Sequence, residues 1–333
     1  KMVMLSGYSH EGKERWTHDV GVFKGQHGPG LQAAVHHGRI VFAHLCQSGG
    51  RVGVLDARTG KQIWSTPYPE PSRKTAYGTP MVRERLTEDG PRKEVVVAST
   101  GTGVRGLDFD TGRELWSMSG VFKERCIVSP IDVLAGSGTN DALITVGCKG
   151  NVFFAVRPPD VRGGEPEVAW RLDKNAPYVP TPVSDGRTVY VLSDGGVLQA
   201  LDALTGAVRW TERLPGNFYA SPLLVAGRLY CKSRSGEMFV AEVGKACKLL
   251  ATSDLKPGDE VAMEFPVAEE TATYAIEGSI KRSRWESKEY TCSFKGNTLV
   301  DISPRDETLE RDHRYIGDPT AQATIPIYLR DHF

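Results

Sequence analysis

Short apolar runs recur along the whole chain and are separated by clusters of Gly, Pro, Asp and Asn. Typical runs lie at 94–98, 188–192 and 228–231, and each is rich in Val, Leu, Tyr or other β-favouring residues. Such lengths and bounding residues are typical of strands joined by tight turns. The pattern therefore predicts an all-β protein.

Three of these runs end in the same phrase, Leu-Asp-x-x-Thr-Gly-x-x-x-Trp, which begins at Leu55, Leu107 and Leu201. The Asp carboxylate can accept backbone N–H bonds in a turn, and the Gly supplies the positive φ that closes it. A second strand then carries the Trp. The phrase predicts a β-hairpin, and weaker copies occur at 7–16, 154–170 and 239–250.

The tryptophans of these hairpins set the period of the repeat. Trp16, Trp64, Trp116, Trp170 and Trp210 are separated by 48, 52, 54 and 40 residues, a period that suits a four-stranded propeller blade. A second phrase, a small residue followed by Pro, opens a further strand between hairpins at Pro80, Pro130, Pro182 and Pro222. We therefore expect a β-propeller with six to eight four-stranded blades, most simply six or seven, and one Trp wedged between each pair of neighbouring sheets.

These hairpins and Ser/Thr-Pro strands resemble the pyrroloquinoline-quinone-like propeller repeat, which is also found in the outer-membrane assembly lipoprotein of the β-barrel machinery and in secreted bacterial propellers. The resemblance covers residues 1–253. Most members of this broad group bind no quinone. A quinone enzyme would be expected to carry adjacent cysteines and a Glu/Asn/Asp calcium set, and the sequence has no Cys-Cys pair. We therefore expect no cofactor, and binding of the quinone is improbable.

The repeats divide the chain into three parts. Residues 1–253 are the propeller repeats, residues 254–280 are expected to close the ring through strands at 264–268 and 273–276 that pair with the hairpin at 2–19, and residues 281–333 form a β-rich accessory or surface-wrapping tail. A competing interpretation uses the segments 256–266 and 290–302. They resemble the β-sandwich tail of β-L-arabinofuranosidase-like glycoside hydrolases.

Composition narrows the possible partners. The 333 residues contain 41 Lys and Arg and 41 Asp and Glu, so no net charge attracts nucleic acid or an anionic membrane over long range. No apolar run is long enough to span a bilayer. Residues 1–5 contain an apolar stretch that is too short for the hydrophobic region of a signal sequence. A processed or truncated start and a periplasmic or secreted location are therefore expected. The six cysteines show no C-x-x-C pair; each is interpreted as a small buried residue, with disulfides left open.

Candidate ligand-binding residues stand just before the first strand of each repeat, where loops of a propeller surround the channel mouth. They combine aromatic rings with positive charge: Lys24, His27, Lys74, Tyr77, Arg125, Lys174, Tyr178, Phe218 and Tyr219. This set could receive an anionic or sugar-like ligand, or its rings could simply plug the channel. No metal site is expected. His36 and His37 look like a turn, and adjacent strand residues would point to opposite faces.

Three functions remain open. The favoured one is a non-catalytic binding or scaffold protein of the bacterial cell envelope or exterior, with a protein or glycan partner at the channel face. The alternative is a carbohydrate-active enzyme, a polysaccharide lyase or glycosidase-like protein, in which His27, Tyr77 or Tyr178 is the base and Lys74 and Arg125 neutralise a uronate. A quinoprotein dehydrogenase is the third. Enzymatic activity and oligomeric state are left undecided.

Overall fold

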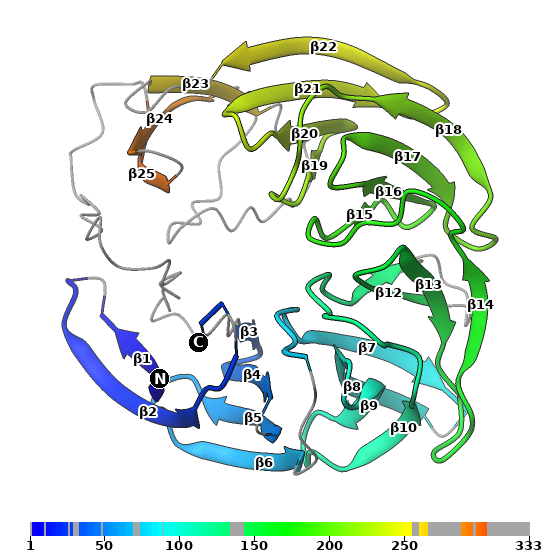
Figure 1. Ribbon diagram of the computed structural model, residues 1–333. Coiled ribbons are helices and arrows are strands. Elements are labelled where there is room, and N and C mark those ends of the chain that lie inside the picture. Colours follow the sequence, from blue (N-terminus) through cyan, green and yellow to red (C-terminus); the bar gives the residue numbers. More distant parts are fainter. Residues whose placement is uncertain are drawn as a thin grey trace. The chain divides into compact units, whose positions relative to one another are not determined.

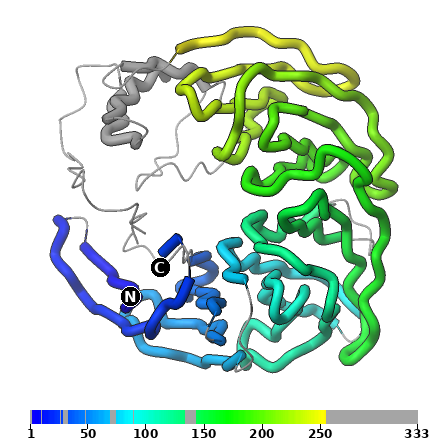
Figure 2. Tube along the Cα trace, viewed as in Figure 1, coloured from blue at the N-terminus to red at the C-terminus, as the bar shows by residue number. Residues whose placement is uncertain are grey.

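The computed structural model describes residues 2–9, 11–25, 27–28, 33–47, 49–68, 74–88, 90–133, 143–254, 260–265, 288–295 and 298–304. Side chains are described up to residue 254. The chain divides into two compact units, Lys1–Pro222 and Leu223–Phe333, which are treated separately below. Within the described ranges every regular element is a strand (Figure 1). Figure 2 shows the Cα trace in the same view.

The first unit contains a two-stranded hairpin and four antiparallel four-stranded sheets, each a simple meander in chain order (Figure 1). The hairpin is β1 (Met2–Tyr8) and β2 (Glu14–Val22). The sheets are β3 (Ala33–His36), β4 (Arg39–Cys46), β5 (Gly49–Asp56) and β6 (Gln62–Tyr68); β7 (Met81–Thr87), β8 (Gly90–Ser99), β9 (Gly103–Asp108) and β10 (Glu114–Met118); β11 (Ile131–Val133), β12 (Leu143–Cys148), β13 (Val152–Arg157) and β14 (Glu167–Arg171); β15 (Val183–Ser184), β16 (Thr188–Leu192), β17 (Val197–Asp202) and β18 (Val208–Arg213).

The second unit repeats the same sheet once and adds a smaller one. Its four-stranded meander is β19 (Leu223–Val225), β20 (Arg228–Lys232), β21 (Glu237–Val243) and β22 (Cys247–Asp254). Its three-stranded sheet is β23 (Glu260–Phe265), β24 (Lys288–Lys295) and β25 (Thr298–Pro304). β23 pairs with β24. Residues 273–276 lie outside the described part, so the ring-closing role of 254–280 and the nature of 281–333 stay predictions.

The predicted hairpin turns form as the sequence implies. Asp56 Oδ1 accepts the backbone N–H and the hydroxyl of Thr59 at 2.8 and 2.7 Å, and Gly60 has a φ of 69°. The hydroxyl of Thr59, more than any other contact, lowers the pKa of Asp56 and keeps the carboxylate ionised to accept these bonds. The turns after β9 and β17 repeat the arrangement at Asp108 and Asp202.

The tryptophans dock each hairpin onto the turn of the next sheet. The indole N–H groups of Trp16, Trp64 and Trp170 donate to the carbonyls of Ala57, Phe109 and Ala203 at 3.1, 2.8 and 3.0 Å. Each of these carbonyls belongs to the residue that follows the Asp of the turn. The prediction of one aromatic wedge between neighbouring sheets is confirmed at these three places.

The Ser/Thr-Pro phrase links neighbouring sheets through its hydroxyl groups. The backbone N–H of Thr79 donates to Ser129 Oγ at 2.9 Å, that of Ser129 to Thr181 Oγ1 at 3.1 Å, and that of Thr181 to Ser221 Oγ at 2.9 Å. The first strands β7, β11, β15 and β19 each begin directly after the Pro of this phrase. In the first unit the phrase therefore joins the segments in front of β7, β11 and β15, and the apolar cores are packed between the sheets.

Candidate functional site

Four of the residues in front of the first strands form one continuous row across neighbouring sheets. The ring centroids of Phe23 and Tyr77 lie 6.3 Å apart, and the Arg125 guanidinium lies 6.0 Å from the centroid of the Tyr77 ring. Arg125 Nη1 also donates to the hydroxyl of Tyr178 at 3.3 Å, and Lys149 Nζ lies 5.8 Å from the Tyr178 ring. We call Phe23, Tyr77, Arg125, Tyr178 and Lys149 the aromatic–basic row.

Backbone hydrogen bonds hold this row in place. The N–H of Tyr77 donates to the carbonyl of Cys126 at 2.8 Å, which joins the loops before β7 and β11. The N–H of Tyr178 donates to Asp194 Oδ2 at 2.7 Å. Because both tyrosines are fixed through their own backbone, their rings are preorganised. Phe23 is 6% exposed and packs against the Tyr77 ring.

The remaining predicted residues are placed differently. Lys24, His27 and Lys174 are exposed, and Tyr219 is 50% exposed. Lys74 forms an ion pair with Glu124 at 3.5 Å. All stand in the loops that precede first strands, as the sequence predicts.

Phe218 is corrected by the structure. Its side chain is 0% exposed, so it does not present a ring to a ligand in this structure. Sequence reasoning placed it in the site because it stands beside Tyr219 in front of a first strand. It also missed Phe23 and Lys149. Phe23 lies ahead of the positions compared in front of the Ser/Thr-Pro phrases, and Lys149 lies in the turn between β12 and β13. Only the tertiary contacts therefore show that both residues belong to the row.

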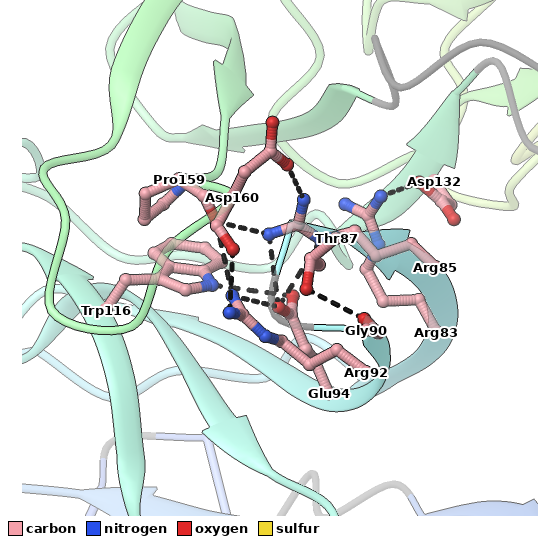
Figure 3. Close-up of polar contacts among 10 residues, drawn as sticks. All are labelled: Arg83, Arg85, Thr87, Gly90, Arg92, Glu94, Trp116, Asp132, Pro159 and Asp160. Carbon is pink, nitrogen blue, oxygen red and sulfur yellow. Dashed lines mark hydrogen bonds and ion pairs between the residues drawn. The ribbon is translucent and has the colours of Figure 1, made fainter.

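A second polar cluster lies between the sheets β7–β10 and β11–β14 (Figure 3). Glu94 is 0% exposed, and its Oε1 lies 3.3 Å from Arg85 and 3.6 Å from Arg92. The same arginines bind the loop after β13: Arg85 pairs with the Asp160 carboxylate at 2.6 Å, and Arg92 donates to the Asp160 carbonyl at 2.7 Å. Both also donate to the carbonyl of Pro159.

This cluster takes the place of the turn carbonyl to which the other indole N–H groups donate. The Asp-x-x-Thr-Gly turn is absent from the repeat after β13, where a Pro/Gly-rich insertion stands instead. The Trp116 indole accordingly donates to Glu94 Oε2 at 3.4 Å rather than to a turn carbonyl. The Trp116 ring is nevertheless 2% exposed and packs in one apolar cluster with residues of both sheets, as the sequence predicts, and only the partner of its N–H group differs from the other interfaces.

Arg83 and Asp132 complete the cluster at the first strands. Their closest atoms, Arg83 Nη2 and Asp132 Oδ1, lie 3.4 Å apart, and the Arg83 side chain is 1% exposed. Burial lowers the pKa of Arg83 and raises that of Asp132, against the attraction of the two opposite charges. The cluster is a structural ion network that pins two sheets together.

A hollow of about 570 Å³ lies at the turn end of the β7–β8 hairpin. Its lining alternates in charge and includes Glu84, Arg85, Arg92, Lys93, Asp108, Asp110 and Arg162. Glu84, one of the lining residues, contacts the adjacent histidines at the end of β3. His36 and His37 both direct Nε2 at Glu84 Oε1, at 2.9 and 3.2 Å.

The expectation that these two rings must diverge is therefore wrong. His36 is the last residue of its strand, and His37 has a φ of 45° in the turn. A left-handed residue breaks the alternation of side chains along a strand. Both rings consequently face the neighbouring sheet.

The meander sheets, the tryptophan docks and the repeat sequences together define a β-propeller of the pyrroloquinoline-quinone-like class. The sequence profile of the family described as outer membrane protein assembly factor BamB matches residues 4–158 and 160–247. The chain belongs to this family.

Individual relatives are more distant. The chain is 28% identical over 186 residues to the serine/threonine-protein kinase AfsK of Streptomyces griseus, and 26% identical over 113 residues to BamB of Yersinia pestis. These matches cover 54% and 33% of this chain, but the chain spans only 21% and 28% of the lengths of those two proteins.

Solved structures share the fold. BamB from Moraxella catarrhalis superposes with a TM-score of 0.52 at 16% identity, covering 90% of this chain and 82% of that one. Sqt1 from Saccharomyces cerevisiae gives 0.57 at 10% identity, covering 90% and 83%. A quinohemoprotein alcohol dehydrogenase from Pseudomonas putida gives 0.52 at 14% identity, covering 72% and 52%. No helix in the described ranges is long and apolar enough to cross a bilayer.

Proposed function

We propose that this chain is a non-catalytic scaffold of the bacterial cell envelope that binds a protein partner through the aromatic–basic row. The family whose profile it matches is described by its role in outer-membrane protein assembly, which favours a protein partner over a glycan and a location outside the cytoplasm. On this proposal the chain needs neither a quinone nor a metal for binding.

The observation that carries the proposal is the alternation of rings and cations in the row. Arg125 lies between two tyrosines, 6.0 Å from one ring and 3.3 Å from the hydroxyl of the other. Tyrosine and arginine are enriched among the residues that dominate binding energy at protein interfaces, because they combine large contact area with directional polar groups. Exposed Lys24 and Lys174 stand in the equivalent loops and would favour an acidic segment of the partner.

A photo-crosslinking experiment tests the proposal. A benzophenone amino acid replaces Tyr219, which is 50% exposed, in a bacterium that expresses the chain, and adducts are identified by mass spectrometry. The same label at Lys61 is the control, because Lys61 is exposed in the turn at the opposite end of a sheet. We expect a protein adduct at position 219 that is lost when Tyr77→Ala and Arg125→Ala are combined, and no such adduct at position 61.

Equal labelling from both positions would contradict a specific binding face. An adduct that survives Tyr77→Ala with Arg125→Ala would show that the row does not bind the partner. An adduct that is carbohydrate, or cleavage of a uronate polymer by the purified chain with new absorbance from unsaturated product, would favour the carbohydrate-active alternative instead.

A further inference from the structure

From the convergence of His36, His37 and Glu84 we infer a binding site for a divalent transition-metal ion, best suited to Zn²⁺, that joins the sheets β3–β6 and β7–β10. The three ligand atoms come from two sheets and lie within 4.8 Å of one another. The site is independent of the aromatic–basic row: His37 follows the first strand β3, whereas the row's loops precede first strands.

The spacing of the ligand atoms suits a metal ion. Zn²⁺ binds imidazole nitrogen and carboxylate oxygen at about 2.0–2.2 Å, which places ligand atoms about 3.3 Å apart in a tetrahedron. The two Nε2–Oε1 distances here are 2.9 and 3.2 Å. A metal ion could therefore replace the two His–Glu hydrogen bonds with small side-chain movements and without a change in the strands.

The backbone and its packing orient the histidines before any ion binds. The ring of His36 stands edge-on to Phe109 at 5.3 Å and to the ring of His37 at 4.2 Å. Phe109 itself is buried and lies under the guanidinium of Arg39 at 5.0 Å. Because His36 is fixed in this way, two of the three ligands are held together on a rigid hairpin.

The ligand set selects the class of metal. Two imidazoles and one carboxylate favour Zn²⁺ and its neighbours over Ca²⁺ or Mg²⁺, which prefer oxygen ligands. The side chains of His37 and Glu84 are 64% and 48% exposed, which leaves solvent access to a fourth position.

One neighbouring group opposes the ion. Lys93 Nζ lies 3.1 Å from Glu84 Oε1 and competes for the same oxygen. Removing this ammonium should therefore strengthen metal binding, whereas it would weaken a purely ionic cluster built around Glu84. The effect of Lys93→Gln thus distinguishes a metal site from a surface salt bridge.

The test is a Zn²⁺ titration of the full chain, without a polyhistidine tag, by calorimetry. We expect one Zn²⁺ bound per chain, a loss of affinity of more than about 100-fold in His37→Gln and in Glu84→Gln, and tighter binding in Lys93→Gln. Glu212→Gln is the matched control, because Glu212 is an exposed strand glutamate outside the site. It should bind Zn²⁺ as the unsubstituted chain does.

Co²⁺ supplies an independent readout. A visible d–d absorption that disappears in His37→Gln, without a thiolate charge-transfer band, would support nitrogen and oxygen ligation at this place. Unchanged Zn²⁺ affinity in His37→Gln and Glu84→Gln, no binding by the unsubstituted chain, or weaker binding in Lys93→Gln would each overturn the inference.

Discussion

The tryptophan docks make a sharp prediction at Gly112, the glycine of the second complete hairpin turn. Gly112 has a φ of 73°, and a Cβ built there would stand 2.4 Å from Trp64 Cε3 and 2.8 Å from Thr66 Oγ1. Gly112→Ala therefore combines two penalties: a left-handed alanine and a collision with an indole ring. Gly120→Ala is the control that carries only the first penalty, because Gly120 has a φ of 72° and nothing lies within 4 Å of the added Cβ.

The magnitudes follow from these contacts. A non-glycine residue in the left-handed region costs about 1–2 kcal/mol, and this is the whole penalty expected for Gly120→Ala. At Gly112 the ring must retreat, which adds about 1–3 kcal/mol of overpacking. The retreat also threatens the 2.8 Å bond from Trp64 Nε1 to the carbonyl of Phe109, worth about 1 kcal/mol. We therefore expect Gly112→Ala to lower the free energy of unfolding by about 3–6 kcal/mol.

Urea unfolding followed by circular dichroism measures both variants. In a Trp64→Leu background the collision with the indole ring is removed and only the 2.8 Å approach to Thr66 Oγ1 remains, so most of the additional cost of Gly112→Ala over Gly120→Ala should disappear. Equal destabilisation by the two glycine variants, or a Gly112→Ala penalty that persists beside Trp64→Leu, would refute the docking argument.

The ion network and a buried histidine give further predictions. Glu94→Gln should destabilise the fold by about 3–5 kcal/mol, because it removes the buried carboxylate that Arg85 and Arg92 share, while Arg85 keeps its ion pair with Asp160. Glu114→Gln, at a pair on the surface, should cost less than about 1 kcal/mol, and equal effects in urea unfolding would contradict a buried network. Burial lowers the pKa of His44 below 6.5, so the unfolded chain takes up the proton first and stability should fall as the pH drops from about 6.5 through the folded pKa. His44→Gln should reduce this acid sensitivity in melting curves recorded between pH 7 and pH 5, and an unchanged slope would argue against His44 as its source.

Four of the five described cysteines bear out the interpretation as small buried residues, and Cys247 does not. Cys46, Cys126, Cys148 and Cys231 are buried free thiols, and Cys247 is half-buried. Burial raises the pKa of Cys231 to about 12, which keeps its thiol protonated and inert at neutral pH. The number and positions of the cysteines in the sequence could not decide between thiols and disulfides, because pairing depends on which sulfur atoms the sheets bring together.

The sequence alone determined the repeating unit of this protein. The Asp-x-x-Thr-Gly turn is a local structure, since Asp56 and Thr59 satisfy each other within one turn, and the Trp that follows was correctly expected to lie between sheets. Strand boundaries followed because each Pro of the second phrase directly precedes a first strand.

Only the tertiary structure decided which side chains meet across sheets. Phe218 and Tyr219 are neighbours in sequence, yet one is buried and the other is half exposed. His36 and His37 converge on Glu84, 48 and 47 residues away in the chain, because one residue of the turn adopts a left-handed φ. Local patterns set turns and strands through short-range sterics and hydrogen bonds, whereas contacts between sheets depend on packing that no single repeat contains.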